Sequence, residues 1–116
     1  LYLAHLLLQI ENHLKKYIME KITKPKIKLL AKGKKFTAKQ MEAKAGDLLP
    51  KHLANIESVL TVIEGECVLA LAGTDHALKQ GDSFIVPSEI VHQIRAITDF
   101  KAVHVMPNDI AFKFFD

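Results

Sequence analysis

Short apolar runs separated by turn residues dominate the chain after residue 25. "SVLTVI" and "CVLALA" flank Glu64-Gly65-Glu66, and "VHQIRAI" and "KAVHVM" flank Thr98-Asp99-Phe100. Each pair is typical of a β-hairpin, in which two β-branched or aliphatic strands meet at a tight turn. Gly46-Asp47 and Gly81-Asp82 mark further turns. Many short strands joined by frequent turns predict an all-β sandwich or barrel.

In the first twenty residues the spacing of the apolar residues differs from that of a strand. Apolar residues recur there at spacings of four and three, which predicts an amphipathic helix with one apolar stripe: Leu3, Leu7, Ile10, Leu14 and Ile18. The apolar portion is shorter than the roughly 20 residues that cross a bilayer, so we expect no membrane segment. We divide the chain into an N-terminal helix or leader over residues 1–20 and one β-barrel domain over residues 21–116. Met19 offers an alternative start, which would make residues 1–18 a leader.

Composition places this chain among globular proteins of one domain. It has 116 residues, of which 49% are hydrophobic and 25% charged, enough for one modest core. Its only cysteine, Cys67, lies in an apolar run and has no partner for an intrachain disulfide. A lone thiol of this kind is typical of a small buried hydrophobe in a reducing compartment. We therefore expect a cytoplasmic protein.

The net charge of +3 is concentrated in one third of the sequence. Twelve of the sixteen basic residues lie between Lys15 and Lys51, and all twelve are lysines. They are scattered, and "KPKIKLLAKGKKF" has a single aromatic residue on which a base could stack. This pattern favours a solvated face over a nucleic-acid surface. The sequence also has no glycine-rich phosphate loop and no serine nucleophile elbow.

Two segments repeat one pattern. "AGDLLPKH" and "QGDSFIVPSEIVH" both contain glycine, aspartate, apolar residues, proline and histidine in that order. A strand pair repeated in a jelly roll would place the two histidines, His52 and His92, on matching strands. We therefore expect both side chains to point into the same lumen.

With their spacing, these residues resemble the two signature motifs of the cupin superfamily. The first motif is a glycine, five spacers, His-x-His, three or four spacers, a glutamate, six spacers and a closing glycine. Gly46, His52 and Gly65 match it in register. Ala54 stands in place of the second histidine, and Ser58 stands in place of the glutamate.

The second motif is a glycine, five spacers, Pro-x-Gly, two spacers, a histidine, three spacers and an asparagine. Gly81, Pro87 and His92 match it, whereas Glu89 replaces the second glycine and Ala96 replaces the asparagine. The resemblance extends over about residues 26–107. It implies a cupin-like jelly-roll β-barrel, to which the N-terminal amphipathic helix is an addition.

The resemblance implies a transition-metal site of three histidines and a glutamate, which holds iron, manganese, nickel or zinc in metal-using cupins. Here only His52 and His92 remain as metal-ligand candidates, because Ala54 and Ser58 do not supply the usual donors. A third ligand could be Glu57, if a bulge in its strand turns the side chain inward. His104, on the last strand that the resemblance covers, is the other candidate. A histidine pair without metal is the alternative.

Three functions follow from these residues. A binding module would hold a small polar or anionic molecule in a pocket that includes His52, His92, Ser58 and His104. A metal-dependent isomerase or dioxygenase would act on a sugar acid or similar metabolite, with a Lewis-acid metal. A structural or regulatory homodimer would use the amphipathic helix as its interface and the lumen only as core. Whether the protein is an enzyme stays open, and we expect a homodimer in each case.

Overall fold

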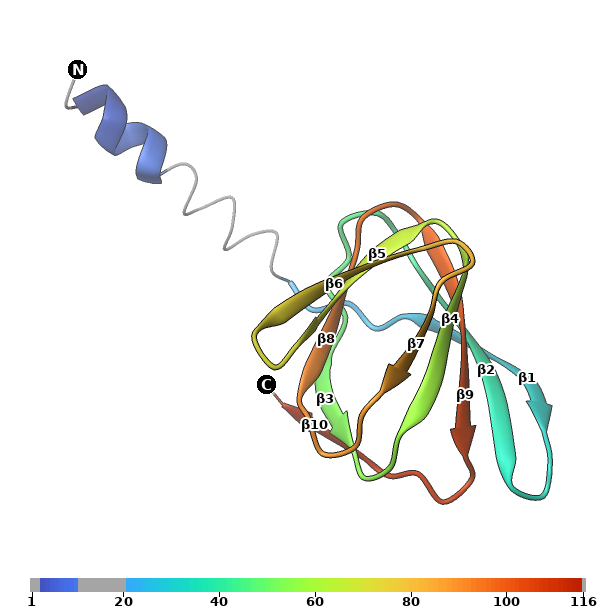
Figure 1. The fold of residues 1–116 in the computed structure, drawn as a ribbon. Helices are drawn as coiled ribbons and strands as arrows, with labels where there is room; N and C mark the ends of the chain where they lie inside the picture. Colours follow the sequence, from blue (N-terminus) through green and yellow to red (C-terminus); the bar gives the residue numbers. More distant parts are fainter. Residues whose placement is uncertain (1–2, 11–20, 116) are drawn as a thin grey trace.

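The computed structural model describes residues 3–10 and 21–115, and residues 21–115 form two five-stranded antiparallel sheets (Figure 1). The strand order is β1-β2-β9-β4-β7 in one sheet and β10-β3-β8-β5-β6 in the other. This architecture confirms the all-β, cupin-like jelly roll expected from the sequence. The strands run as follows: β1 Lys26–Lys32, β2 Phe36–Ala43, β3 Lys51–Ala54, β4 Ser58–Glu64, β5 Glu66–Leu71, β6 Thr74–Lys79, β7 Ser83–Val86, β8 His92–Ala96, β9 Phe100–Pro107 and β10 Phe112–Phe115.

The apolar core fills one end of the space between the sheets. Alternate residues of each strand point inward, and the most deeply buried of them are Leu60, Val62, Leu69, Phe100 and Ala102. Along β9 the inward positions continue from these apolar residues to a histidine. The other end of the barrel therefore carries the polar side chains of the lumen.

Backbone conformation explains two positions of the signature motifs. Gly65 has φ +76°, and a Cβ there would overlap the carbonyl oxygen of Asp99 in the neighbouring β8–β9 turn. Only glycine fits this close approach without strain. Glu89 has φ 63°, the left-handed conformation that favours the glycine which the second motif has at this position.

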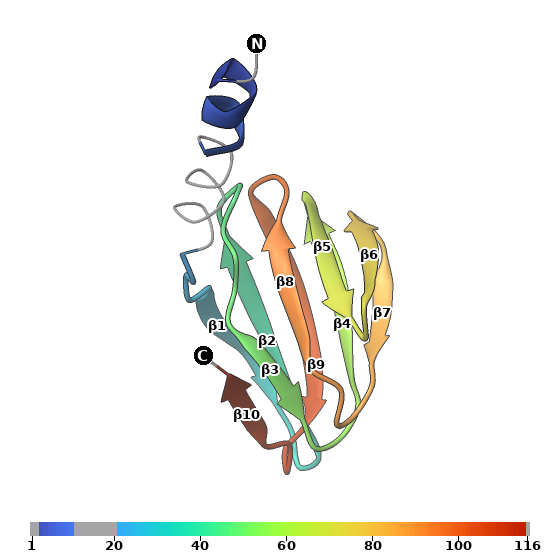
Figure 2. The ribbon, with the colours of Figure 1, turned by 90° about the vertical axis from the view of Figure 1, so that its left-hand side faces the viewer.

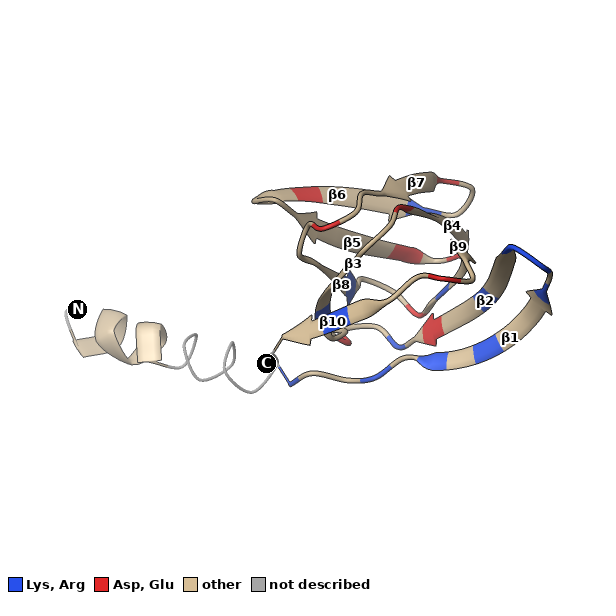
Figure 3. Ribbon diagram, turned by 90° about the horizontal axis from the view of Figure 1, so that it is seen from below, with Lys and Arg blue, Asp and Glu red and all other residues tan. Residues whose placement is uncertain are grey.

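Each sheet ends in an exposed strand on one side. β1 is exposed along all seven residues, and Figure 3 shows that Lys and Arg positions are concentrated on β1 and on its turn to β2. β10 pairs with β3, at the edge of the second sheet (Figure 2). Lysine and apolar residues alternate at the start of β1, and Lys113 separates Phe112 from Phe114 on β10. These edges form the open side of the barrel.

Residues 3–10 form a helix in which all eight residues are exposed (Figure 1). The predicted apolar stripe is present there as Leu3, Leu7 and Ile10. Leu14 and Ile18 fall outside the described residues, and the division of the chain at residue 20 stays a prediction. Within the described parts, none of the helical structure is both long and apolar enough to cross a bilayer.

Candidate functional site

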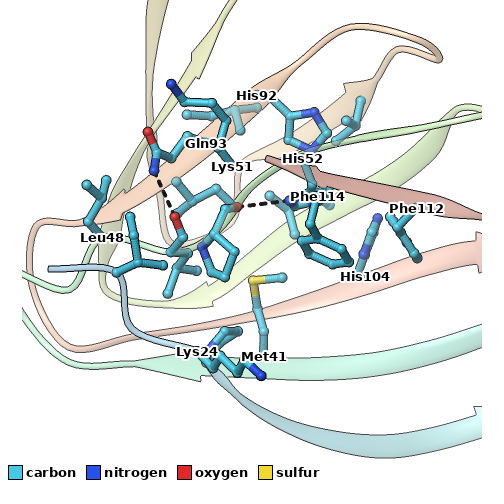
Figure 4. A pocket seen from close by; sticks show the side chains of 18 of the residues that line it. Lys24, Met41, Leu48, Lys51, His52, His92, Gln93, His104, Phe112 and Phe114 are labelled. Carbon is cyan, nitrogen blue, oxygen red and sulfur yellow. Dashed lines mark hydrogen bonds between the residues drawn. The ribbon is translucent and has the colours of Figure 1, made fainter. Parts of the chain in front are cut away.

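His52 and His92 lie opposite each other on adjacent strands of one sheet. His52 belongs to β3 and His92 begins β8, and the two residues are register partners. Their ring centroids are 4.4 Å apart, and the planes meet at 63° (Figure 4). Opposed residues on the same face of a sheet have neighbouring side chains. The structure thus brings together the two histidines that the repeated sequence pattern singled out.

Matching hydrogen bonds hold the two imidazoles. His52 Nδ1 lies 3.0 Å from the carbonyl oxygen of Pro50, and His92 Nδ1 lies 3.0 Å from that of Ile90. A carbonyl oxygen can only accept, so Nδ1–H is the donor in both cases. In the neutral ring the free lone pair is therefore on Nε2. Both rings are oriented by their own strand and keep Nε2 for a ligand.

A third histidine occupies the same end of the lumen. His104 of β9 shares a hydrogen bond of 2.6 Å between its Nε2 and the Oγ of the buried Ser58. Burial, together with smaller effects of the charges of His52, His92 and Lys39, lowers the pKa of His104 to about 4. The ring is therefore neutral at pH 7, and its Nε2 is already used by the serine.

The pKa of His92 is also lowered, mainly because the ring is buried and in smaller part because His52 is close. The hydrogen bond to the Ile90 carbonyl opposes this shift, since it stabilises the protonated ring. His92 is consequently neutral at physiological pH in the absence of a ligand. An anion beside the ring would raise this pKa again.

The three histidines line one cavity of about 1090 Å³. Its wall is largely apolar and comes from both sheets. Two phenylalanines of β10 lie close to His52, with centroid distances of 5.6 Å for Phe112 and 5.2 Å for Phe114 (Figure 4). Both phenylalanines are exposed, so they lie at the mouth of the cavity.

The charged residues around this cavity have one sign. Lys24, Lys39, Lys51 and Arg95 line it, whereas none of its described lining residues is an aspartate or glutamate. A concave surface lined by charges of one sign raises the local concentration of the opposite ion. The cavity is therefore suited electrostatically to an anion.

Glu57, one of the two possible third ligands, lies elsewhere. Its side chain is exposed, and it lines a separate groove with Phe36, Ile85 and Val105. Glu57 directly precedes β4, whose register from Ser58 to Thr61 against β7 is regular, and it is not among the residues that line the cavity of the histidines. Glu57 is thus apart from the cavity, and His104 is the candidate that the structure brings to it.

The donor set does not fit the metal site of the superfamily. Within residues 3–10 and 21–115, no three His, Cys, Asp or Glu side chains are grouped so as to hold a metal ion. Ala54 is buried at the position of the second histidine, and the imidazole of His104 is bonded to Ser58 where a glutamate would stand. Two free imidazoles are fewer than the three protein ligands of a catalytic zinc site.

Residues 39–106 match the cupin domain family. The chain belongs to the cupins. Its motifs, its two sheets and the lumenal position of both motif histidines agree with this assignment. No curated protein sequence matches this cupin.

Several solved structures are similar to this cupin. An uncharacterised protein with a double-stranded β-helix domain from Klebsiella pneumoniae has a TM-score of 0.71 at 22% identity, over 83% of this chain and 88% of that chain. An RmlC-like cupin from Desulfovibrio desulfuricans is 28% identical, with a TM-score of 0.65 over 72% and 82% of the two chains. KdgF from Halomonas sp. is 20% identical, with a TM-score of 0.67 over 72% and 77%.

The phenylalanines of the cavity mouth are not among the site residues expected from the sequence. The structure places the segment that carries them as β10, beside β3. The alternation in "FKFF" is the signal that could have found them. Phe112 and Phe114 are two residues apart and therefore share one face of a strand.

Proposed function

We propose that this cupin binds a small anionic molecule in its lumen and that His52 and His92 contact it. The observation that carries this proposal is the pair of imidazoles, 4.4 Å apart, each with Nδ1 bonded to the backbone carbonyl two residues before it. Two Nε2 atoms on one side of a cavity offer neighbouring positions for the oxygens of a carboxylate or phosphate. The four lining cations support an anion in this place.

Binding of an anion at this pair is coupled to proton uptake. A neutral imidazole presents only a lone pair at Nε2, and it becomes a donor to an anionic oxygen when it is protonated. The pKa of His92 is lowered in the free protein, so the proton is taken up as the anion binds. By linkage, affinity for a carboxylate rises as the pH falls from 8 toward the pKa of free His92.

Titration with acetate and with inorganic phosphate, followed by NMR chemical shifts, tests this proposal. We expect His52→Ala and His92→Ala each to weaken binding about tenfold or more, since a hydrogen bond to a charged group is lost. His76→Ala is the matched control, because its ring packs on Phe84 outside the cavity lining. Equal losses in His76→Ala and His92→Ala, or absence of binding to the wild type, would overturn the proposal.

We also propose a homodimer formed through the exposed edge of the first sheet. Leu29 and Leu30 of β1 are 58% and 43% exposed, and an exposed strand edge can pair with a second chain. Light scattering should give twice the chain mass for the wild type and a smaller mass for Leu30→Lys. A wild-type monomer would refute the dimer.

Cys67 supports a location in the cytoplasm, which we propose as well. Burial raises the pKa of its thiol to about 11, so it stays protonated at neutral pH. A single inert thiol suits a reducing compartment. Fractionation of the native host should find the protein with cytoplasmic markers, and its recovery in an oxidising compartment would refute this location.

A further inference from the structure

Apolar side chains surround the polar atoms of the lumen. Leu69 and Ile94 line the cavity from the sheet of His52 and His92, and Leu60, Met41 and Met106 line it from the opposite sheet. A ligand rich in hydroxyl groups would leave most of them unpaired against this wall, which costs binding energy. A ligand with a single charged group and an apolar body would match both parts of the cavity.

The mouth of the cavity adds an aromatic surface. Phe114 pairs with His52 and Phe112 pairs with Ala54, so both rings lie on the lumenal face of β10. The ring centroids are 6.3 Å apart, and Phe114 remains 62% exposed. Exposed apolar groups that line a cavity are typical of a ligand site. The two rings lie next to the imidazole pair, within reach of one small molecule (Figure 4).

We infer that the ligand is a monocarboxylate with an aromatic or branched apolar body. Its carboxylate lies against His52 and His92, and its body packs against Phe112, Phe114 and the methionines of the opposite wall. The other titratable and charged groups that line the cavity are His104, which is bonded to Ser58, Lys39, which is the register partner of His104, and the cations Lys24, Lys51 and Arg95. This inference rests on the proposed function and names the class of ligand for that site.

Calorimetric titration of the full chain with four probes tests the inference. Benzoate carries both parts, acetate only the carboxylate, benzyl alcohol only the body, and gluconate a carboxylate with a hydroxylated body. We expect benzoate to bind about tenfold more tightly than each of the other three, because only benzoate uses both the imidazole pair and the apolar wall.

Variants of the two phenylalanines locate the body of the ligand. Phe112→Ala and Phe114→Ala should each weaken benzoate binding several-fold, on the order of 3- to 10-fold, and leave acetate binding unchanged. Phe36→Ala is the matched control, because Phe36 is a similarly exposed phenylalanine that lines the separate groove. It should leave benzoate binding unchanged. Loss of benzoate binding in Phe36→Ala equal to that in Phe114→Ala would overturn the aromatic contact.

The outcomes separate the two proposals. If acetate and gluconate bind as tightly as benzoate, the inference on the apolar body fails and the anion site stands. If benzyl alcohol binds as tightly as benzoate, the carboxylate contributes nothing and the proposed function fails. If none of the four probes binds, both proposals fail.

Discussion

The stability of this cupin should fall in mild acid because of His104. The ring is neutral in the folded protein, since its pKa is lowered from 6.5 to about 4 by burial and by His52, His92 and Lys39. In the unfolded chain it titrates near 6.5. Between these two pKa values the unfolded chain binds more protons, so lowering the pH favours unfolding. The contribution of His104 is fully present above the unfolded pKa and is lost as the pH falls toward 4.

The magnitude follows from the two pKa values. A difference of 2.5 pKa units (6.5 minus about 4) limits the loss to about 3.4 kcal/mol at very low pH. At pH 5, where the folded state is largely unprotonated, the loss relative to pH 8 is about 2 kcal/mol. That loss moves the midpoint of a urea unfolding curve by about 1 M.

Urea unfolding of the wild type and His104→Gln at pH 8 and pH 5 measures this contribution. The difference between the two pH values should be about 2 kcal/mol smaller in His104→Gln, because glutamine does not titrate. The outward-facing Val103→Ala is the control, since it should lower both free energies of unfolding equally. An unchanged pH dependence in His104→Gln would refute the assignment of a neutral, buried imidazole to His104.

Three further variants test the turns and the donor set. Gly65→Ala should lower the free energy of unfolding by about 3 kcal/mol, because alanine there adds left-handed strain and an overlap with Asp99. Gly73→Ala is the control, since Gly73 has φ +78° in open space, and it should lower the free energy of unfolding by only about 1 kcal/mol. Equal losses of stability in thermal melts of the two variants would contradict the overlap. Glu89→Gly should stabilise the fold by roughly 0.5–1 kcal/mol, because Glu89 has a left-handed backbone; a lower melting temperature would argue against strain there. The double variant Ala54→His, Ser58→Glu should bind about one zinc ion per chain after dialysis against zinc, as measured by elemental analysis. The same zinc content in the wild type would show that the native side chains already suffice to bind the metal.

Short strands and turns predicted the all-β class, the cupin resemblance implied the jelly roll, and the repeated pattern predicted that His52 and His92 meet. Strand alternation and turn residues are local signals, and the register that pairs the two histidines follows from a jelly roll built of matching strands. The exclusion of Ala54 as a donor also follows from residue identity alone. These features depend on strand alternation, turn residues and residue identity, all of which can be read directly from the sequence.

The partners of His104 and the cavity mouth could not be predicted in the same way. Whether His104 faces the lumen depends on the exact length of the hairpin at Thr98–Phe100, since one residue more or less would turn it outward. The contact of Phe114 with His52 depends on the chain returning after β9 to the edge of the other sheet. Such long-range strand pairing is hard to predict from the local pattern of the sequence.

Nitrogen-15 NMR of the imidazoles during a benzoate titration tests the central claim most directly. If His52 and His92 hold one carboxylate between them, both Nε2 resonances should move toward the protonated position along a single saturation curve with one Kd. If only one resonance moves, or if the two follow curves with different Kd values, the histidines do not share a ligand, and the proposed site is contradicted.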